Sequence, residues 1–211
     1  MSNQSTIIQH ILDIARSQIG TLESPINSNK TKYGKWYGLD GNPWCMMFVQ
    51  WCFAQAGQAL PYKTASCSDL LNWYRKNQPD RVNTTAQPGD IVIYHFGHTG
   101  IVESVGANTI TAIEGNTSPG NSGSQDNGGG VFRRTRKLSQ VRAFIRPKLK
   151  TESEEKPMDN VPSSAHQKGV DWAVKNGLLS GNAQGDLMLT QPITRQQFCT
   201  MLLRYHEKFG R

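Results

Sequence analysis

The sequence places a thiol, Cys45, at a predicted helix start and an imidazole, His98, in a predicted β-hairpin. A thiol and an imidazole are the two groups that cooperate in cysteine-dependent hydrolysis. In "NPWCMMFVQWC" (42–52), Asn42 can cap a helix and Pro43 is favoured at its first position. Cys45 would then lie in the first turn, where unpaired N–H groups and the helix dipole stabilise a thiolate. The alternative is a buried structural cysteine, the commonest environment of a free thiol. Cys52, among aromatic residues in mid-helix, is expected in the core.

The segment "HFGHTGIVESVGANTITAIEGN" (95–116) offers a base for that thiol. Two runs rich in β-branched residues flank a glycine-containing stretch, which is typical of a β-hairpin. We predict a three-residue loop at 106–108, with Val105 opposite Thr109.

In this register a histidine, a carboxylate and an amide share one face of the sheet. His98 lies opposite Asn116 and one diagonal step from Glu114. A carboxylate or amide that accepts the proton of one imidazole nitrogen fixes the tautomer and leaves the other nitrogen for the thiol. His95 has no comparable partner and is expected to be structural, and a surface histidine is the alternative for His98. A slip of one residue would turn Glu114 to the other face.

The elements that must position these groups are helices first and strands second. An amphipathic helix is predicted near the N-terminus, and two more around Cys45 and in "SCSDLLNWYRKN". Strands are predicted in "GDIVIYHF", "HTGIVESV" and "TITAIEG". This order predicts an α+β fold. The first helix buries apolar residues at helical spacing: Ile7, Ile8, Ile11, Leu12, Ala15 and Ile19.

Composition narrows the class of protein. The 211 residues carry a net charge of +7, which lies entirely in residues 1–150. Much of it falls in "VFRRTRKLSQVRAFIRPKLK" (131–150), and a basic face would favour an anionic polymer, either nucleic acid or a bacterial wall polymer. Apolar runs are too short for a membrane span, and no secretory signal is expected at the start. Four cysteines without a CxxC pair indicate reduced thiols and synthesis in the cytosol.

The chain is predicted to hold two domains. Residues 1–148 form the first domain, the polar, proline-containing segment 149–162 is a linker, and residues 163–211 form a small, mostly helical domain. In the second domain one helix follows Ser163 or Ser164 as a cap and stops at Gly177, and another begins with Thr194 and Gln197 in capping-box spacing. Two short helices make a poor core, so this module is expected to need a partner.

The blocks "GNPWCMMFVQWCFAQAG", "QPGDIVIY", "GHTGIVESV" and "TAIEGNTS" resemble, in this order, those of the CHAP family of cysteine-dependent peptidoglycan amidohydrolases and peptidases. The resemblance spans roughly residues 5–148 and implies a papain-like α+β fold. It implies that Cys45 is the nucleophile, His98 the base, Glu114 the orienting carboxylate and Asn116 the supporting amide.

The resemblance also implies acyl transfer, with a Cys45 thiolate attacking an amide carbonyl and the Cys45 N–H as oxyanion donor. Trp44, Trp36 and Trp73 are candidates to line a groove for glycan or stem peptide. Some CHAP enzymes bind calcium before the nucleophile, but "TKYGKWYGLDGN" supplies only Asp40 as a carboxylate. Because a hard cation needs several oxygen ligands, no metal or other cofactor is expected.

The second domain resembles one S-layer homology repeat, on "GVDWAVKNGLLSG" and "PITRQQFCTMLLRY". Such repeats bind secondary wall polymers, usually in sets of three, and Trp172 and Arg195 fall in the blocks linked to packing and ligand contact. A single copy suggests that copies of this domain associate. An internal start at Met158, after "ESEEK", would supply free C-terminal domains for that association.

Together these features predict a bacteriophage endolysin that cleaves Gram-positive peptidoglycan as an N-acetylmuramoyl-L-alanine amidase or an endopeptidase. It would be made in the host cytoplasm and reach the wall through a holin-type pore. A host autolysin or a virion-associated hydrolase would share the chemistry, and a non-catalytic wall-binding adaptor is the nonenzymatic alternative. A nucleic-acid binder rests only on the basic stretch and lacks a recognition motif, so neither nucleic acid nor a membrane is expected as a partner.

Overall fold

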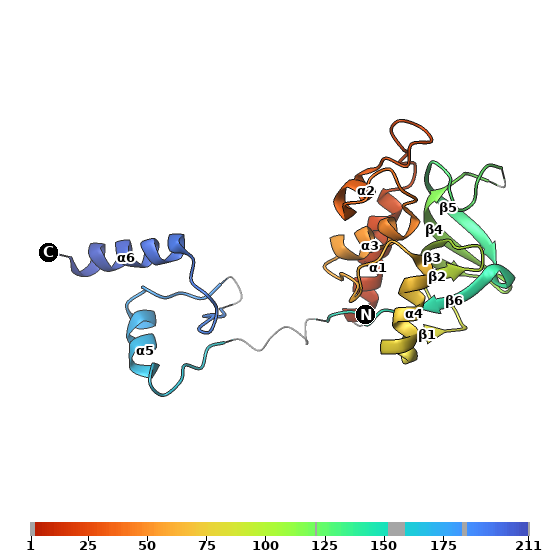
Figure 1. The fold of residues 1–211 in the computed structure, drawn as a ribbon. Coiled ribbons are helices and arrows are strands. Elements are labelled where there is room, and N and C mark those ends of the chain that lie inside the picture. The colour runs from red at the N-terminus through yellow and green to blue at the C-terminus, as the bar shows by residue number, and fades with distance from the viewer. Residues whose placement is uncertain (1–2, 121, 152–158, 183–184, 211) are drawn as a thin grey trace. The chain divides into compact units, whose positions relative to one another are not determined.

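The computed structural model describes residues 3–120, 122–151, 159–182 and 185–210, and the chain divides into two compact units, Met1–Glu152 and Ser153–Arg211 (Figure 1). The first unit opens with the helices α1 (Asn3–Ser17), α2 (Lys32–Tyr37), α3 (Cys45–Gln55) and α4 (Cys67–Asn77). Its strands are β1 (Val82–Asn83), β2 (Ile91–Tyr94), β3 (Thr99–Val105), β4 (Thr109–Thr117), β5 (Gly130–Lys137) and β6 (Val141–Ile145). Short 3-10 turns lie at Pro79–Arg81 and Leu138–Gln140.

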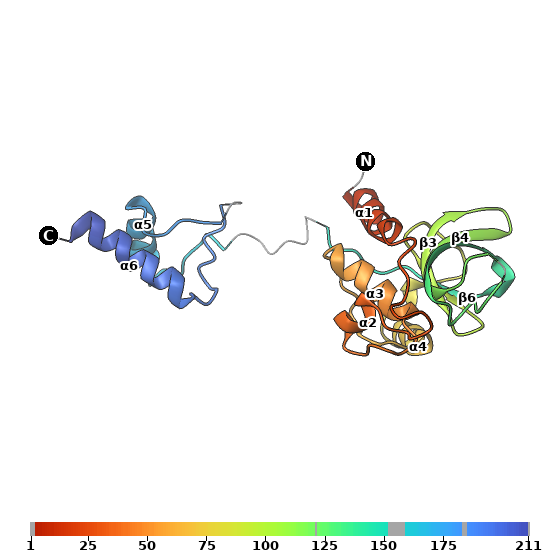
Figure 2. The same ribbon diagram turned by 90° about the horizontal axis from the view of Figure 1, so that it is seen from above.

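The strands form one six-stranded sheet in the order β1-β6-β2-β3-β4-β5, and the neighbours pair antiparallel. Helices α1, α2 and α3 lie together on one side of this sheet, and the strands curl around their own second core (Figures 1 and 2). The predicted α+β class, with helices before an antiparallel sheet, is therefore confirmed. The expected first helix is confirmed as well, because Ile11, Leu12 and Ala15 of α1 are buried.

The central strand β2 shows how the sheet is held on both faces. All four of its residues are buried, which requires that both faces be covered. Ile91 and Ile93 belong to the main core beneath the helices, whereas Val92 and Tyr94 belong to the second cluster. This strand, with a neighbour on each side, supports the hairpin that carries His98.

The β3–β4 hairpin differs from the predicted register at its tip. Val105 pairs with Ile110 instead of Thr109, so the predicted pairing at the loop is wrong. A bulge between Val102 and Ser104 absorbs one residue, and beyond it Ile101 pairs with Ile113, as the predicted register requires. The prediction therefore fails at the loop and holds at the end of the hairpin nearest His98.

The helix that carries Cys45 also begins differently from the prediction. Trp44 occupies the cap position of α3 without a side-chain cap, and Cys45 is the first helical residue. Asn42 is exposed, and its side chain donates to the carbonyl of Leu39 at 3.4 Å, so the predicted Asn42 cap is wrong. The later start places Cys45 at the very end of the helix, where its dipole acts most strongly.

The basic segment 131–150 divides between buried and exposed side chains, with Arg133, Lys137, Arg142, Lys148 and Lys150 exposed. Arg134 and Arg136 are buried because they alternate with outward residues along β5. Arg133 pairs with Glu103, and Arg146 pairs with Asp90. Arg133, Arg136 and Arg146 thus form ion pairs within the first unit.

The second unit contains α5 (Gln167–Lys175) and α6 (Arg195–Phe209). The predicted capping box of Thr194 and Gln197 is confirmed. The helix α5 starts at Gln167 after an uncapped His166, so the predicted serine cap is wrong, whereas Gly177, with φ +68°, does follow the helix end. The division between the units falls within 149–162, although Leu149 still packs in the main core of the first unit.

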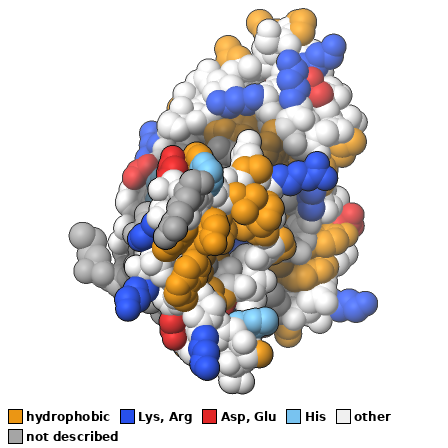
Figure 3. Space-filling view, turned by 90° about the vertical axis from the view of Figure 1, so that its left-hand side faces the viewer, with side chains coloured by type: hydrophobic (Ala, Val, Ile, Leu, Met, Phe, Trp, Pro, Cys, Tyr) orange, Lys and Arg blue, Asp and Glu red, His pale blue; other side chains and the backbone are white. Residues whose placement is uncertain are grey.

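Among the described residues of the second unit, Leu178 is the buried hydrophobic residue. Hydrophobic side chains gather instead at the molecular surface (Figure 3). No helix among the described residues is long and apolar enough to cross a membrane. The large exposed hydrophobic residues of the second unit are Val161, Trp172, Val174, Met188, Ile193, Phe198, Leu202, Leu203, Tyr205 and Phe209.

Candidate active site

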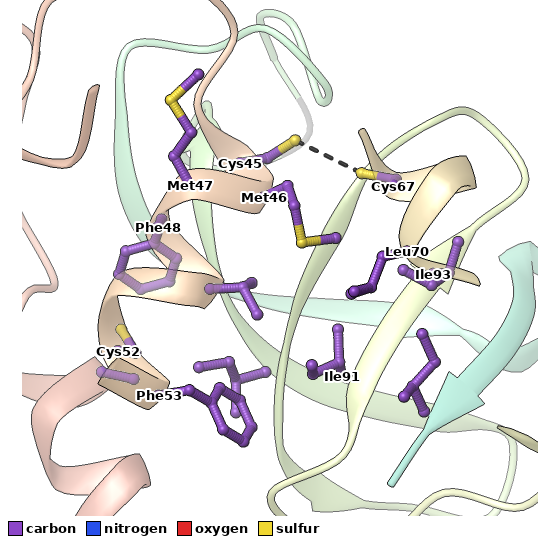
Figure 4. Packing of buried hydrophobic residues seen from close by; sticks show 14 of the residues in the cluster. Cys45, Met46, Met47, Phe48, Cys52, Phe53, Cys67, Leu70, Ile91 and Ile93 are labelled. Atoms are coloured by element: carbon purple, nitrogen blue, oxygen red, sulfur yellow. Dashed lines mark hydrogen bonds between the residues drawn. The ribbon is translucent and has the colours of Figure 1, made fainter. Parts of the chain in front are cut away.

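Two thiols face one another at the starts of two helices. Cys45 begins α3 and Cys67 begins α4, where Ser66 accepts a hydrogen bond from the backbone N–H of Asp69 as the cap. Their sulfur atoms point toward one another and lie 3.8 Å apart, and both cysteines are free thiols (Figure 4). Each side chain is only 6% exposed. Both thiols thus lie at helix starts, where unpaired backbone amides favour a negative charge.

The two thiols titrate in opposite directions. The hydrogen bond from Cys67, helped by the nearby His98, holds the pKa of Cys45 well below its ordinary value despite burial. The same hydrogen bond, burial and the charge on Cys45 raise the pKa of Cys67 well above its ordinary value. These directions favour the thiolate on Cys45 and the neutral thiol on Cys67. Cys52 is buried in the core, as predicted.

His98 is completely buried and is oriented by Glu114. Its Nε2 lies 3.1 Å from Oε2 of Glu114, so the carboxylate accepts the Nε2 proton. Burial alone would lower the pKa of His98, but the interactions with the neighbouring Cys45 and Glu114 raise it to about 9. Its Nδ1 is buried and has no hydrogen-bond partner within the described part of the chain. This arrangement leaves Nδ1 available to the Cys45 thiol.

Glu114 is itself held by two further residues, Tyr94 and Arg136. The Tyr94 hydroxyl donates to Oε1 at 2.8 Å, and Arg136 donates from Nε to Oε1 at 3.0 Å and from Nη2 to Oε2 at 2.5 Å. Burial would raise the pKa of Glu114, but the hydrogen bonds from His98 and Arg136 lower it. The carboxylate therefore stays ionised although no part of it reaches the surface.

The sequence prediction missed Tyr94 and Arg136. Arg136 packs over the rings of Tyr94 and Phe96, which in turn stack with His98. The alternation in "VFRRTRK" (131–137) could have indicated Arg136. Arg134 and Arg136 fall on one face of the strand, and Val131 and Thr135 fall on the other. An arginine on the inward face of a strand needs an anion, and Glu114 on the adjacent strand supplies it.

Asn116 lies next to this group but does not bond to the imidazole in this structure. Its backbone is left-handed, with φ +59°, at an irregularity in the β4–β5 pairing. Its side-chain nitrogen donates to the carbonyl of Asp126 at 3.1 Å, and its Oδ1 is buried without a partner among the described residues. Asn116 here anchors the segment that joins β4 to β5, and its carbonyl also accepts from the N–H of Gly128.

The three tryptophans expected to line a groove lie in different environments. Trp44 is fully buried, stacks on Tyr33 and donates from Nε1 to Glu23 at 3.0 Å, so its ring has no surface for a wall polymer to contact. Trp36 is 41% exposed. Trp73 is half-buried against a neighbouring tyrosine ring. The structure thus leaves Trp36 as the most accessible of the three.

The two candidate wall-binding residues lie in the second unit. Trp172 is exposed on α5 and its ring stacks on Phe209 of α6 at 5.5 Å. Arg195 is the exposed first residue of α6. Trp172 therefore takes part in joining the two helices of this unit.

The remaining candidates from the sequence are a metal site near Asp40 and the second histidine, His95. The described ranges of the chain contain no group of three or more His, Cys, Asp or Glu side chains that could hold a metal ion. Asp40 accepts a hydrogen bond from the backbone of Thr31 at 2.9 Å. His95 follows β2 directly and is exposed, whereas His98 is buried.

Comparison with protein families picks out the segment that carries this geometry. Residues 36–116 match the CHAP domain. The matched segment runs from α2 to the end of β4 and contains both thiols, His98, Glu114 and Asn116. No curated protein sequence matches the chain.

Solved structures similar to this chain include an endolysin and Ly7917. The crystal structure of a wild-type endolysin, LysIME-EF1, is 16% identical with a TM-score of 0.43, over 68% of this chain and 65% of that one. The crystal structure of Ly7917 is 19% identical with a TM-score of 0.39, over 66% and 62%. The crystal structure of Ly7917 with the hydrolyzing product of MDP is 20% identical with a TM-score of 0.38, and the match covers 66% of this chain and 62% of that one. The chain thus spans less than two thirds of the length of these structures.

Proposed function

We propose that the chain is a peptidoglycan hydrolase that cleaves amide bonds by nucleophilic catalysis at Cys45. The observation that carries this proposal is a helix-terminal cysteine beside a buried histidine whose Nε2 lies 3.1 Å from Oε2 of a buried glutamate. The CHAP-domain match over residues 36–116 supports the choice of peptidoglycan as substrate.

In the proposed mechanism the Cys45 thiolate attacks the carbonyl carbon of the scissile amide. The backbone N–H of Cys45, at the start of α3, donates to the developing oxyanion. Protonated His98 delivers its proton to the departing amine, and Glu114 stabilises the imidazolium throughout. A water molecule, deprotonated by His98, then hydrolyses the thioester and restores the thiolate.

Two bonds are compatible with this chemistry. Cleavage between muramic acid and L-alanine makes the protein an amidase, and cleavage within the stem or cross-bridge makes it an endopeptidase. Both place an amide carbonyl at Cys45, so the distinction lies in the groove that holds the substrate. Trp36 is the exposed aromatic residue that we propose contacts glycan or peptide there.

Mass spectrometry of fragments released from purified Gram-positive peptidoglycan tests the proposal. Free stem peptides with intact glycan would identify an amidase, and new amino termini in the cross-bridge an endopeptidase. Cys45→Ala is expected to release neither, whereas Cys199→Ala, which removes the exposed thiol of the second unit, should behave as the parent. Folded protein that releases nothing from several walls would favour a non-catalytic wall-binding adaptor.

For the second unit we propose binding to a secondary wall polymer, with association between copies. Its exposed apolar side chains and nearly absent core support a need for a partner. Light scattering behind size-exclusion chromatography should give a mass above that of a monomer, and a monomer at micromolar concentration would overturn the association. Met158, the suggested internal start, lies outside the described residues; the appearance of a C-terminal fragment during untagged expression would support it.

We further propose a phage source, synthesis in the host cytoplasm and release to the wall through a separate pore. An autolysin or a virion-borne hydrolase would act by the same chemistry but reach the wall differently. A nucleic-acid function loses its main support, because Arg133, Arg136 and Arg146 are engaged with carboxylates of the first unit.

A further inference from the structure

Cys67 is a second thiol inside the candidate active site for which the proposed hydrolysis has no chemical step. Its sulfur lies 3.8 Å from that of Cys45, and both side chains are almost fully buried (Figure 4). The other two cysteines are placed differently. Cys52 lies two turns along α3 from Cys45, about 10 Å of helical rise away, and Cys199 is exposed in the second unit.

We propose that Cys67 is a resolving thiol, which forms a disulfide with Cys45 after hydrogen peroxide has oxidised Cys45. The disulfide would switch the hydrolase off and protect the nucleophile from irreversible oxidation. The loss of activity rests on the proposed function, whereas the formation of the disulfide depends only on the two thiols.

The chemistry balances in two steps. The Cys45 thiolate attacks one oxygen of hydrogen peroxide, the O–O bond breaks, and the products are a sulfenic acid on Cys45 and hydroxide. The sulfur of Cys67 then attacks the sulfur of Cys45, the S–O bond breaks, and the departing hydroxide leaves as water with the Cys67 proton. Peroxide is reduced and the two thiols are oxidised by two electrons in total.

The electrostatics of the pair favour this order of events. As long as Cys45 carries its charge, that charge and the hydrogen bond it accepts hold the pKa of Cys67 high, so Cys45 alone reacts with peroxide. Oxidation of Cys45 to a neutral sulfenic acid removes both effects. Of the causes that raise the pKa of Cys67, burial then remains alone, so its sulfur becomes a better nucleophile once its target is in place.

The chain around the two cysteines permits the final approach of the sulfurs. A disulfide needs a sulfur–sulfur distance of about 2 Å, so the two sulfurs, now 3.8 Å apart, must approach by about 2 Å. Both cysteines are the first residues of their helices, and residues 58–66, before α4, form no helix or strand. In the proposed reaction the final approach comes from rotation of the two side chains and a small shift at the start of α4.

The test treats the full chain with hydrogen peroxide and measures both its disulfides and its activity. Peptide mass spectrometry should find the peptide that contains Cys45 joined to that containing Cys67, lighter than the separate peptides by two hydrogen atoms. Cys45→Ser should leave Cys67 reduced under the same treatment. Cys199→Ser is the matched control and should form the Cys45–Cys67 disulfide like the parent.

Recovery after dithiothreitol separates protection from simple inactivation. The parent should regain most of the activity on peptidoglycan that it had before peroxide. The fraction of its own starting activity that Cys67→Ser regains should be at least about tenfold smaller, with sulfinic or sulfonic acid on Cys45. Cys67→Ala serves as a second variant, and circular dichroism checks that each variant folds.

Sulfinic acid on Cys45 in the parent, without the disulfide, would overturn the proposal. Disulfide formation in a protein that never cleaves peptidoglycan would instead support the resolving thiol and overturn the proposed function.

Discussion

The two units of this chain bury their side chains in opposite ways. The first packs Trp44, Phe48 and Tyr74 out of contact with solvent and can therefore also bury Glu114 and Arg136 as a paired, fully bonded group. The second places Phe198, Leu202 and Tyr205, each at least half exposed, on the surface of α6. A complete core lets the first unit hold charged groups in fixed positions, whereas the second leaves apolar surface that we propose a partner covers.

The strongest test of this contrast is whether catalysis depends on one buried histidine of the first unit. His98→Gln removes the group that protonates the leaving amine, so turnover of peptidoglycan should fall by about 10²- to 10⁴-fold. His95→Gln, on the exposed neighbour, should change the rate little. Equal losses in both variants would contradict the assignment of His98 as the base.

A matched pair of phenylalanines compares the two cores directly. Phe48→Ala empties a fully buried site of the first unit and should lower the free energy of unfolding by about 3–5 kcal/mol in urea titrations. Phe198→Ala, at a site 52% exposed, should cost less than about 1 kcal/mol in a monomer. A large effect of Phe198→Ala that grows with protein concentration would show that its side chain is covered by a second copy.

Substitution of Arg136 tests the buried electrostatics of the first unit. In the parent, kcat/KM should decline as the pH rises through about 9, because His98 loses the proton it must deliver. Arg136→Met removes the guanidinium that holds Glu114 ionised; the pKa of His98 then falls, and the alkaline decline should move to lower pH. The rate at neutral pH should drop by about tenfold.

Arg133→Met is the matched control for Arg136, because Arg133 lies on the same strand and pairs with Glu103 instead. It should leave the pH profile unchanged. A profile that shifts equally in both variants would mean that the effect is a general loss of positive charge. Thermal unfolding of each variant separates a change in the profile from a loss of fold.

The smallest expected effect concerns an ion-pair group at the surface of the first unit. Arg133 and Arg16 lower the pKa of Glu103 to about 2, below its ordinary value of 4.5. Because the folded-state pKa is depressed, this stabilisation is present above pH 4.5 and is lost as the pH falls toward 2. Glu103→Gln should therefore lower stability by about 1 kcal/mol at neutral pH, with the difference vanishing in acid.

Local patterns predicted the elements and the central residues of the site, and failures came where tertiary contacts decide. Helical spacing and β-branched runs were sufficient to place Cys45 at a helix start and His98 beside Glu114. The Asn42 cap failed because the helix begins later, and Trp44 turned inward because Glu23, 21 residues earlier, accepts its N–H. Arg136 was counted as surface charge, since its pairing with Glu114 joins segments whose proximity no short motif reveals.

The bulge between Val102 and Ser104 has a consequence for how this hairpin tolerates change. It separates a tip with one pairing register from a base with another, so a residue gained or lost at the tip need not reach the strands beside His98. The tip at 106–108 is therefore a natural place to graft a peptide tag or a second binding loop. Insertions on the other side of the bulge, between Thr99 and Val102, would instead rotate the imidazole away from its carboxylate.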